Sequence, residues 1–500
     1  MSTADWGIAA AVLTALGMAF LGIAATRGRK PSLDDYITAR GSTSSWGSLA
    51  SVVASVMGAW ILFSPAEAAT WAGIAGLTGY AVGQAAPVAA YWAVGVRMRR
   101  LMPNGHALTE FVWHRYGRPM FLAVLAIVVL YMFTFLAAEL GAIARAVQLV
   151  TGTPLLVTLM LVAGATLAYT VYGGLRASIV TDGVQFAIIA PLLAVLFVAG
   201  LWALGGWDAA MAPVRESAPE LLDWGYQPGV DFGITLIIAI LAANLFHQGF
   251  WQRVYAAESE RAVRRGYLVG ALVVVPMVMA TGMFGLWAMG RGVGGPGAIS
   301  LFTLALEVLP GWVLVVLVVL ALALVMSSID TLLNGIVSAL ASGIPGLLGS
   351  ARTPRRLLVS ARWVTVALAV PAIIVGYAFD SVLYLFLIAD LVCAGAVVPT
   401  FLGLYERHLS GRGALVSTLA GIAVGALFFP SPGFTSWWSW DGLAPLWHVL
   451  VPGSTLASFL LALVVSTVVA AIWVGLARGA GAPGFDFATL GSVRALEEEA

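Results

Sequence analysis

The sequence has little charge and almost no cysteine. Only 10% of its 500 residues are Asp, Glu, Lys or Arg, whereas 61% are hydrophobic and the mean hydropathy is +0.96. A soluble globular chain carries about 25% charged residues, so this composition excludes one. The single cysteine, Cys393, rules out an intramolecular disulfide and a cysteine-rich metal site. No nucleotide-binding loop, nucleophile–base set or metal motif stands out, so an enzyme is not expected.

The sequence instead contains a series of long apolar runs. They are continuous and exceed the alternating segments of about ten residues that build a β-barrel, so they predict an all-α polytopic membrane protein. We expect thirteen transmembrane helices, at about 6–25, 46–68, 72–96, 120–148, 154–172, 178–204, 232–251, 266–290, 311–341, 357–378, 381–405, 411–430 and 456–477.

Basic residues are placed asymmetrically around these spans. With the N-terminus outside and the C-terminus inside, all of the 25 Lys and Arg residues except Arg145, Arg215 and Arg291 fall on the cytoplasmic side. Cytoplasmic loops carry an excess of Lys and Arg, so the sequence predicts this orientation in the cytoplasmic membrane. Lys30 is the sole lysine, and such an arginine-dominated set is typical of a GC-rich bacterial genome.

The chain divides into two segments of similar length, each with five predicted spans. Because five is odd, the two segments enter the membrane from opposite sides, as the inverted repeats of many secondary transporters do. Polar or flexible residues mark the breaks expected in their first helices, Gly58 and Ser64-Pro65 in one and Asn244 and His247–Gly249 in the other. We expect a single membrane domain, 1–478, with an accessory helix at 6–25, repeats at 46–204 and 232–405, two peripheral helices at 411–477 and a solvated cytoplasmic tail at 479–500.

One predicted helix carries a polar cluster deep in the membrane. The run from Gly311 to Met326 descends about 24 Å through a hydrocarbon core of about 30 Å before it reaches Ser327, Ser328, Asp330 and Thr331. An ionisable residue at this depth indicates a functional site. Hydroxyls beside a carboxylate form an all-oxygen set, which suits a hard cation such as Na⁺.

A second buried acid, Asp182, is expected at a matching depth. It lies about 8 Å into its span from the cytoplasmic end, in the same inner third as Ser327. Two carboxylates and several hydroxyls at one level would suit a monovalent cation. The alternative is a local salt bridge between Asp182 and Arg176.

Several motifs, in order along the chain, resemble the sodium:solute symporter family. Tyr172-Gly173-Gly174-Leu175-Arg176-Ala177, followed by Thr181-Asp182 and Gln185, is similar to the family signature. Ser51–Trp60 resembles the first core helix, Gln252-Arg253 with Ala256–Ser259 resembles the stretch after the sixth, and Met326–Thr331 resembles the ion-site helix. The resemblance spans nearly the whole chain. It implies a LeuT-like fold, a five-plus-five inverted repeat with broken helices, and coupling of Na⁺ to uptake of sugars, amino acids, carboxylates, urea or vitamins.

The resemblance also implies ion-binding residues. The principal Na⁺ site would use the carbonyls of Ala54, Met57 and Leu324 and the hydroxyls of Ser327 and Ser328. Some members bind a second Na⁺, which here would fall among Asp182, Ser327, Asp330 and Thr331. Proline-type members have an acid where this chain has Val56, which argues against a proline-type solute site.

The solute site is predicted from depth and from the family pattern. Its candidates come from four core helices: Trp60, Phe63, Ser64 and Glu67 from the first, Gln84 from the second, His247, Gln248 and Trp251 from the sixth, and Asp390 from the tenth. Gln84 lies near the position where sugar-transporting members have an acid, so a sugar is disfavoured. Asp390 could bind a solute amine or pair within the protein.

We therefore expect a Na⁺-coupled symporter that moves a small polar organic solute into the cell by alternating access. Its partners would be Na⁺, the solute and the lipid bilayer, with no nucleic acid and no obligate protein partner. Two alternatives stay open. Asp182 and Asp330 could couple H⁺ in place of Na⁺, and the membrane domain could act as a solute sensor.

Overall fold

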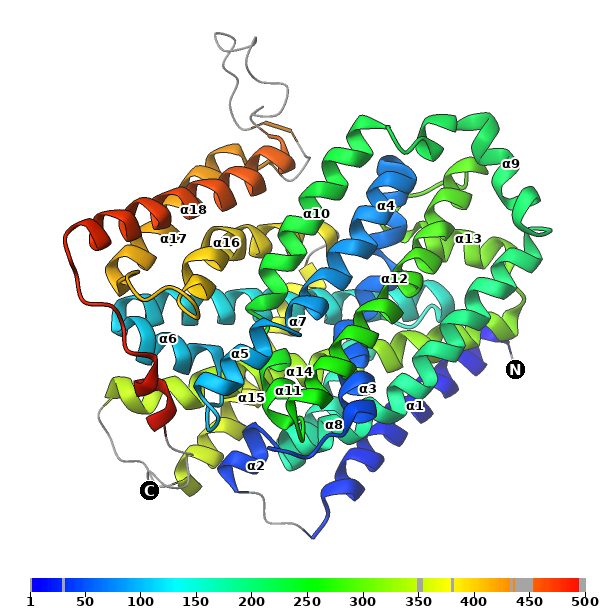
Figure 1. The fold of residues 1–500 in the computed structure, drawn as a ribbon. Coiled ribbons are helices and arrows are strands. Elements are labelled where there is room, and N and C mark those ends of the chain that lie inside the picture. Colours follow the sequence, from blue (N-terminus) through cyan, green and yellow to red (C-terminus); the bar gives the residue numbers. More distant parts are fainter. Residues whose placement is uncertain are drawn as a thin grey trace.

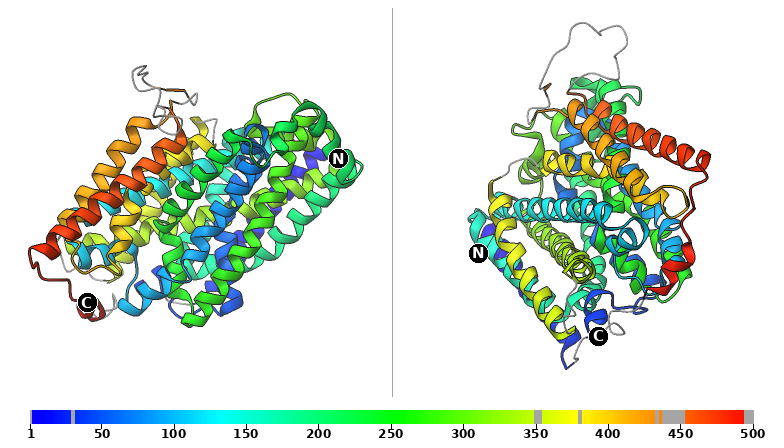
Figure 2. Two further views of the ribbon diagram at one scale, coloured as in Figure 1. Left: turned by 45° about the horizontal axis from the view of Figure 1, so that its top comes forward. Right: turned by 90° about the vertical axis from the view of Figure 1, so that its left-hand side faces the viewer.

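The protein is a bundle of α-helices (Figures 1 and 2). The computed structural model describes residues 2–28, 32–348, 354–378, 382–431, 435–436 and 453–493, so the last seven residues of the predicted tail lie outside the described part. Within these ranges the only β-type pairing is an isolated parallel bridge between Thr43 and Ala257. The predicted all-α membrane architecture is confirmed.

The first half of the chain forms α1 to α9. Their bounds are α1 Thr3–Thr26, α2 Leu33–Ile37, α3 Ser45–Val56, the 3-10 turn η1 Ala59–Leu62, α4 Ser64–Ala90, α5 Val94–Leu101, α6 Leu108–Tyr116, α7 Arg118–Thr151, α8 Leu155–Ala203 and α9 Trp207–Ser217.

The second half follows the turn η2. Its elements are η2 Pro219–Leu222, α10 Gln227–Leu245, α11 Gln248–Ala256, α12 Glu260–Gly290, η3 Gly297–Ile299, α13 Ser300–Val308, α14 Gly311–Leu348, α15 Pro354–Ala378, α16 Val382–Leu402, α17 Gly411–Phe428, α18 Thr455–Gly479 and η5 Phe487–Ser492.

Helix α8 contains two of the predicted spans. Its 49 residues would extend about 74 Å, more than twice the hydrocarbon thickness. Gly174 divides it into two arms, because its φ of 58° and ψ of −147° are not helical. A Cβ at this position would also approach the Tyr36 ring to 2.6 Å, so the backbone angle and the neighbour both favour glycine. The arms match the predicted spans 154–172 and 178–204.

The described residues contain ten helices that are long and apolar enough to cross a membrane, with α8 counted once. Counting α8 as two crossings and adding the two predicted within 46–96, which fall on α3, η1 and α4, would give thirteen. The count and the orientation stay predictions.

Both predicted helix breaks are present. In the first half, α3 ends at Val56, Met57 is extended, and η1 begins only at Ala59. In the second half, α10 ends at Leu245 and α11 begins at Gln248. Two helices that stop inside the bundle leave backbone groups without helical partners, so these breaks are where ligands can bind to backbone.

Helix α14 lies at the centre of the bundle. In its most apolar window 78% of the residues are buried, against 28% for α1 and for α18. It packs against α3, α7 and α8, whereas α17 and α18 pack on each other and on α16 at one edge (Figure 1). The polar residues of α14 are therefore enclosed by other helices and shielded from lipid. The start of the tail also packs on the body, since Leu490 of η5 is buried.

Candidate functional site

The polar cluster of α14 meets Asp182 of α8. Ser327 Oγ donates a hydrogen bond to Asp182 Oδ1 at 2.7 Å, and the other carboxylate oxygen accepts one from Ser51 Oγ of α3 at 2.5 Å. Asp182, Ser51 and Ser327 are buried to 1% exposure or less. Asp182, one of the two carboxylates expected at one depth, therefore lies in a hydrogen-bonded network that joins α3, α8 and α14.

Arg253 of α11 neutralises Asp182. Its Nη2 lies 2.7 Å from Asp182 Oδ2 and 2.7 Å from Thr331 Oγ1, and its Nε donates to Ser51 Oγ at 2.8 Å. Arg253 is only 1% exposed. The alternative partner Arg176 pairs with Asp35 at 2.7 Å, so the local salt bridge is not formed. A buried charge with a hydrogen-bonded counter-ion is stable where a lone one is not.

Asp330 is held by hydroxyl groups. It accepts hydrogen bonds from Tyr169 Oη and Ser178 Oγ, each at 2.7 Å, and it lies 3.2 Å from Thr331 Oγ1. No described Lys or Arg forms an ion pair with it. The network therefore holds two carboxylates and one guanidinium, which leaves one negative charge over when all three are ionised.

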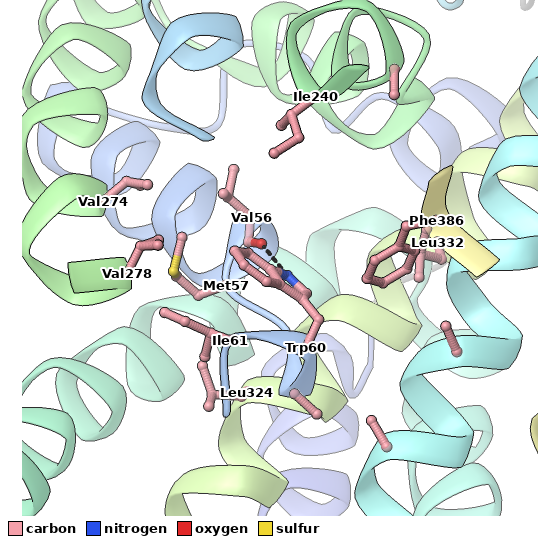
Figure 3. Packing of buried hydrophobic residues seen from close by; sticks show 14 of the residues in the cluster. Val56, Met57, Trp60, Ile61, Ile240, Val274, Val278, Leu324, Leu332 and Phe386 are labelled. Atoms are coloured by element: carbon pink, nitrogen blue, oxygen red, sulfur yellow. Dashed lines mark hydrogen bonds between the residues drawn. The ribbon is translucent and has the colours of Figure 1, made fainter. Parts of the chain in front are cut away.

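The end of α3 presents free carbonyl oxygens beside α14. The helix stops at Val56, and among the described residues no hydrogen bond reaches the carbonyl oxygen of Ala54 or that of Met57. Thr331 Oγ1 of α14 lies 3.2 Å from Ser55 Oγ of α3, so the two elements are in direct contact. Met57, Ile61 and Leu324 belong to one buried hydrophobic cluster (Figure 3). Unpaired backbone carbonyls are unfavourable inside a bundle unless a cation or water binds them.

The two serines of α14 keep acceptor capacity. Ser328 Oγ donates to the carbonyl of Leu324 at 3.3 Å, and Ser327 Oγ donates to Asp182. A hydroxyl that gives its proton to one partner still has lone pairs for a cation. Ala54, Met57, Leu324, Ser327 and Ser328 therefore each offer an oxygen, the donor type that Na⁺ prefers.

A small inner cavity lies between α4, α7, α10 and α16. Its volume is about 20 Å³, room for one water molecule. Gln84 and Asp390, both predicted as solute ligands, line it together with Asn244 and the rings of Tyr80, Tyr131, Phe135 and Phe386. Phe135 and Phe386 stack at a centroid distance of 4.7 Å across the cavity wall.

A larger outer cavity, of about 410 Å³, lies at the other end of α4 and α10. Glu67 and Asp231 line it with the rings of Trp71 and Phe232. Leu383 of α16 lines both cavities, so they adjoin. Volumes of about 300 to 1,000 Å³ are typical of small-molecule sites.

The amino-acid sequence matches the model of one protein family. The model described as the sodium:solute symporter family matches residues 36–421, which is more than three quarters of the chain. The chain belongs to the sodium:solute symporter family. It is a transporter, and no enzymatic role is assigned to it.

Known relatives of this symporter carry different solutes. It is 27% identical over 433 residues to a spermidine transporter of Candida albicans, covering 85% of this chain and 80% of the relative. It is 25% identical over 449 residues to a sodium/glucose cotransporter of Vibrio parahaemolyticus, covering 79% of each. A solved Na⁺-coupled sialic acid symporter, described with a novel Na⁺ site, superposes with a TM-score of 0.76 at 17% identity over 94% of this chain and 98% of its own. That likeness confirms the broken-helix fold.

None of the other predicted solute residues is among the described residues that line the two cavities of the symporter. Trp60 stacks on Tyr80 and donates its indole N–H to the carbonyl of Val56 at 3.0 Å (Figure 3). His247 packs on Phe250, Tyr131 and Phe135, behind the inner cavity. The remaining candidates, Phe63, Ser64 and Trp251, are buried in the core, and the Trp251 indole is bonded to the carbonyl of Leu245.

Gln248 is directed away from both cavities. Its side chain bonds the backbone of His106, in the segment between α5 and α6, and that of Leu108, the first residue of α6. His106 in turn lies 3.0 Å from Asp34 and 3.2 Å from Glu110. Burial alone would lower the pKa of His106, but the hydrogen bonds and charges of both carboxylates outweigh it and raise the pKa to about 9. An ionised cluster therefore ties α2 and α6 to the second broken helix.

Sequence reasoning missed two functional contacts. Glu139 of α7, which is not among the predicted site residues, accepts the backbone N–H groups of Ala59 at 2.6 Å and Trp60 at 3.2 Å, and thus caps the turn after the first break. A Cβ on Gly58 would collide with this carboxylate, which explains the glycine. Arg253 belongs to a predicted family motif, but its contact with Asp182 was not predicted. An arginine so close to a helix break was the available signal, because a buried cation needs a buried acid.

Proposed function

We propose that Na⁺ is the coupling ion and that it binds between the end of α3 and the serines of α14. The ligands are the carbonyls of Ala54, Met57 and Leu324 and the hydroxyls of Ser327 and Ser328. The observation that carries the proposal is the pair of free carbonyl oxygens at the break of α3, a helix that contacts α14 through Ser55 and Thr331.

We propose that a second monovalent cation is bound at Asp330. The residual negative charge of the Asp182, Arg253 and Asp330 network supports this, because an uncompensated charge in the membrane is expensive. A second Na⁺ held by Asp182, Ser327, Asp330 and Thr331, or a proton on Asp330, would neutralise it. The two ions differ in what drives uptake, so they can be separated by experiment.

In this mechanism Na⁺ binding holds α3 against α14, solute binds in the inner cavity, and both are released to the cytoplasm after the outer side closes. An inside-negative potential contributes about 2.3 kcal/mol per charge per 100 mV. One coupled cation then gives roughly fifty-fold accumulation of a neutral solute at about 100 mV.

We place the protein in the cytoplasmic membrane of a bacterium, with the N-terminus outside.

We propose the inner cavity as the solute site, because two predicted ligands, Gln84 and Asp390, both line it. The outer cavity at Glu67 would be the vestibule. The relatives named for spermidine and for glucose differ in charge and shape, so their names leave the solute open within small polar organic molecules.

Reconstituted protein tests the coupling. Uptake into proteoliposomes over a panel of amines, amino acids, sugars, carboxylates and urea should require an inward Na⁺ gradient and be abolished when K⁺ replaces Na⁺. If a pH gradient drives uptake in Na⁺-free buffer, the coupling ion is H⁺. If solute binds but no gradient drives its uptake, the protein is a sensor and the symport proposal is wrong.

A further inference from the structure

The inner cavity contains a carboxylate that the protein does not neutralise. Asp390 is 6% exposed, lines the cavity, and forms no hydrogen bond or ion pair with any described residue. No Lys, Arg or His is among the described residues that line this cavity. An ionised carboxylate removed from water without a partner is strongly unfavourable, so the cavity favours whatever can compensate it.

The other walls of the cavity suit an organic cation. Four aromatic rings surround the space, and the π-face of an aromatic ring attracts an ammonium group. Tyr131 Oη already donates to Asn244 Oδ1 at 3.3 Å, whereas Gln84 has no hydrogen bond to a described residue and can still accept one from an amine N–H. A bare Na⁺ needs an all-oxygen shell, which walls made mostly of rings and aliphatic side chains do not supply.

We infer that the transported solute is an organic cation, an amine or quaternary ammonium whose positive nitrogen pairs with Asp390 between these rings. This rests on the proposed function, because it assigns the solute class of that same cavity. A neutral sugar or amide would leave Asp390 without a counter-ion, and a carboxylate solute would be repelled by it.

The outer cavity supports the same class of solute. Glu67 Oε2 is buried there without a hydrogen-bond partner among the described residues, while Asp231 is held by Gln227 at 2.7 Å. Leu383 and Asp390 are seven residues apart on α16, or about 10 Å. A cation would thus meet acids in the vestibule and again at the end of its path. The loop 205–231 adds Asp208, Glu216, Glu220 and Asp223 against Arg215 alone, a field that steers cations inward.

The cavity must widen before such a solute fits, because it now holds about one water. The stacked pair Phe135 and Phe386 joins α7 to α16. Phe386 and Asp390 are four residues apart on one face of α16, so separating these rings would open the cavity beside Asp390. Aromatic rings that part around a cation keep contact with it through their faces.

The test uses matched pairs of probes on the purified full-length protein in NaCl. Choline and dimethylbutanol share a shape and differ in charge, as do putrescine and butanediol. We expect choline or putrescine, at millimolar concentration, to raise the thermal unfolding midpoint, and the neutral counterpart, glucose and pantothenate to leave it unchanged. Asp390→Asn should weaken binding of the active cation roughly 30-fold or more, as the loss of a buried charge pair does.

Glu67→Gln should weaken the same binding by a smaller factor of about three to ten, with a reduced dependence on salt. Glu307→Gln removes an exposed acid outside both cavities and should change nothing. Asp390→Asn should retain the stabilisation by Na⁺ relative to K⁺, which shows that it folds.

The inference is overturned if neither cation stabilises the protein, if a neutral counterpart works equally well, or if Asp390→Asn binds the cation normally. Failure of the coupling proposal looks different. In that case a cation binds through Asp390, but Na⁺ and K⁺ stabilise the protein equally and solute binding does not depend on Na⁺.

Discussion

Asp182 and Asp390 are both buried acids within the membrane-spanning bundle, and their surroundings are opposite. Asp182 is bonded to Ser51, Ser327 and Arg253, so its charge is compensated by the protein. Asp390 lies in a cavity with no such partner. Glu139 is intermediate, since it is bonded by two backbone N–H groups and by no cation.

The difference between the two acids distinguishes a structural role, that of Asp182, from a ligand-binding role, that of Asp390. Asp182 joins α3, α8, α11 and α14, and these helices must be in place for its charge to be tolerated. Asp390 joins nothing, so its charge is compensated only when something binds. A buried acid is therefore informative about function through the partners that it lacks.

The largest expected effect comes from removing the partner of Asp182. Arg253→Met leaves the carboxylate buried without a cation and should reduce stability by about 3–5 kcal/mol. Asp390→Asn removes a charge that has no partner, so in the absence of solute it should leave stability unchanged or raise it. Thermal unfolding of the purified variants measures both.

The double variant Arg253→Met with Asp182→Asn provides the control. It removes both charges, so it should recover a large part of the stability lost in Arg253→Met. Equal destabilisation of the double and single variants would show that Arg253 acts by packing, and the comparison between the two acids would fail.

A second compensated cluster lies outside the membrane and should appear as pH dependence. The pKa of His106 in the folded protein is raised to about 9, above the unfolded value of about 6.5. Its stabilising contribution, at most about 3 kcal/mol, is fully present below about pH 6.5 and is lost as the pH rises through 9.

Thermal unfolding midpoints between about pH 6 and pH 10 measure this loss. His106→Gln should flatten the decline, whereas substitution of the exposed His114 in α6 should not. An unchanged decline in His106→Gln would assign the pH dependence to another group.

A smaller loss of stability is expected for Glu139, which is bonded by two backbone N–H groups and by no cation. Glu139→Leu leaves the N–H groups of Ala59 and Trp60 without acceptors, and we expect a loss of about 2 kcal/mol. Glu139→Gln keeps one acceptor oxygen and should lose about half as much. If both variants are as stable as the unaltered protein, the carboxylate does not hold the turn after the break.

Much of this arrangement could be predicted from local sequence. The breaks at Gly58 and near His247 were predicted because polar and flexible residues interrupt apolar helices there, and both are confirmed. The neighbourhood of Ser327 and Asp182 followed from depth alone, because residues at one level of a bundle are brought together by packing.

Contacts set by tertiary geometry could not be predicted. Arg253 and Asp182 are 71 positions apart, whereas the nearby Arg176 was a local candidate that Gly174 directs toward Asp35. Gln248 has the polarity of a solute ligand, but its side chain bonds the backbone of His106 and Leu108 and lines neither cavity. Helix α8 runs through both predicted spans, and only the backbone angles of Gly174 divide it into two arms.

The smallest expected effect distinguishes Ser327 from Ser328, both of which are predicted from the sequence as ligands of the principal Na⁺ site. Ser328 bonds only the carbonyl of Leu324, so Ser328→Ala should raise the Na⁺ concentration for half-maximal uptake about tenfold and leave the Na⁺-free protein equally stable. Ser327 also donates to Asp182, so Ser327→Ala should weaken Na⁺ binding and also reduce stability in K⁺ by about 1 kcal/mol.

Ser417→Ala is the matched control for both serines. Its hydroxyl bonds the carbonyl of Gly413 within α17, far from the ion site, so neither the Na⁺ dependence nor the stability should change. Unchanged Na⁺ dependence in both Ser327→Ala and Ser328→Ala would contradict the proposed ion site. Equal loss of stability in the two variants would show that the bond from Ser327 to Asp182 contributes nothing to stability.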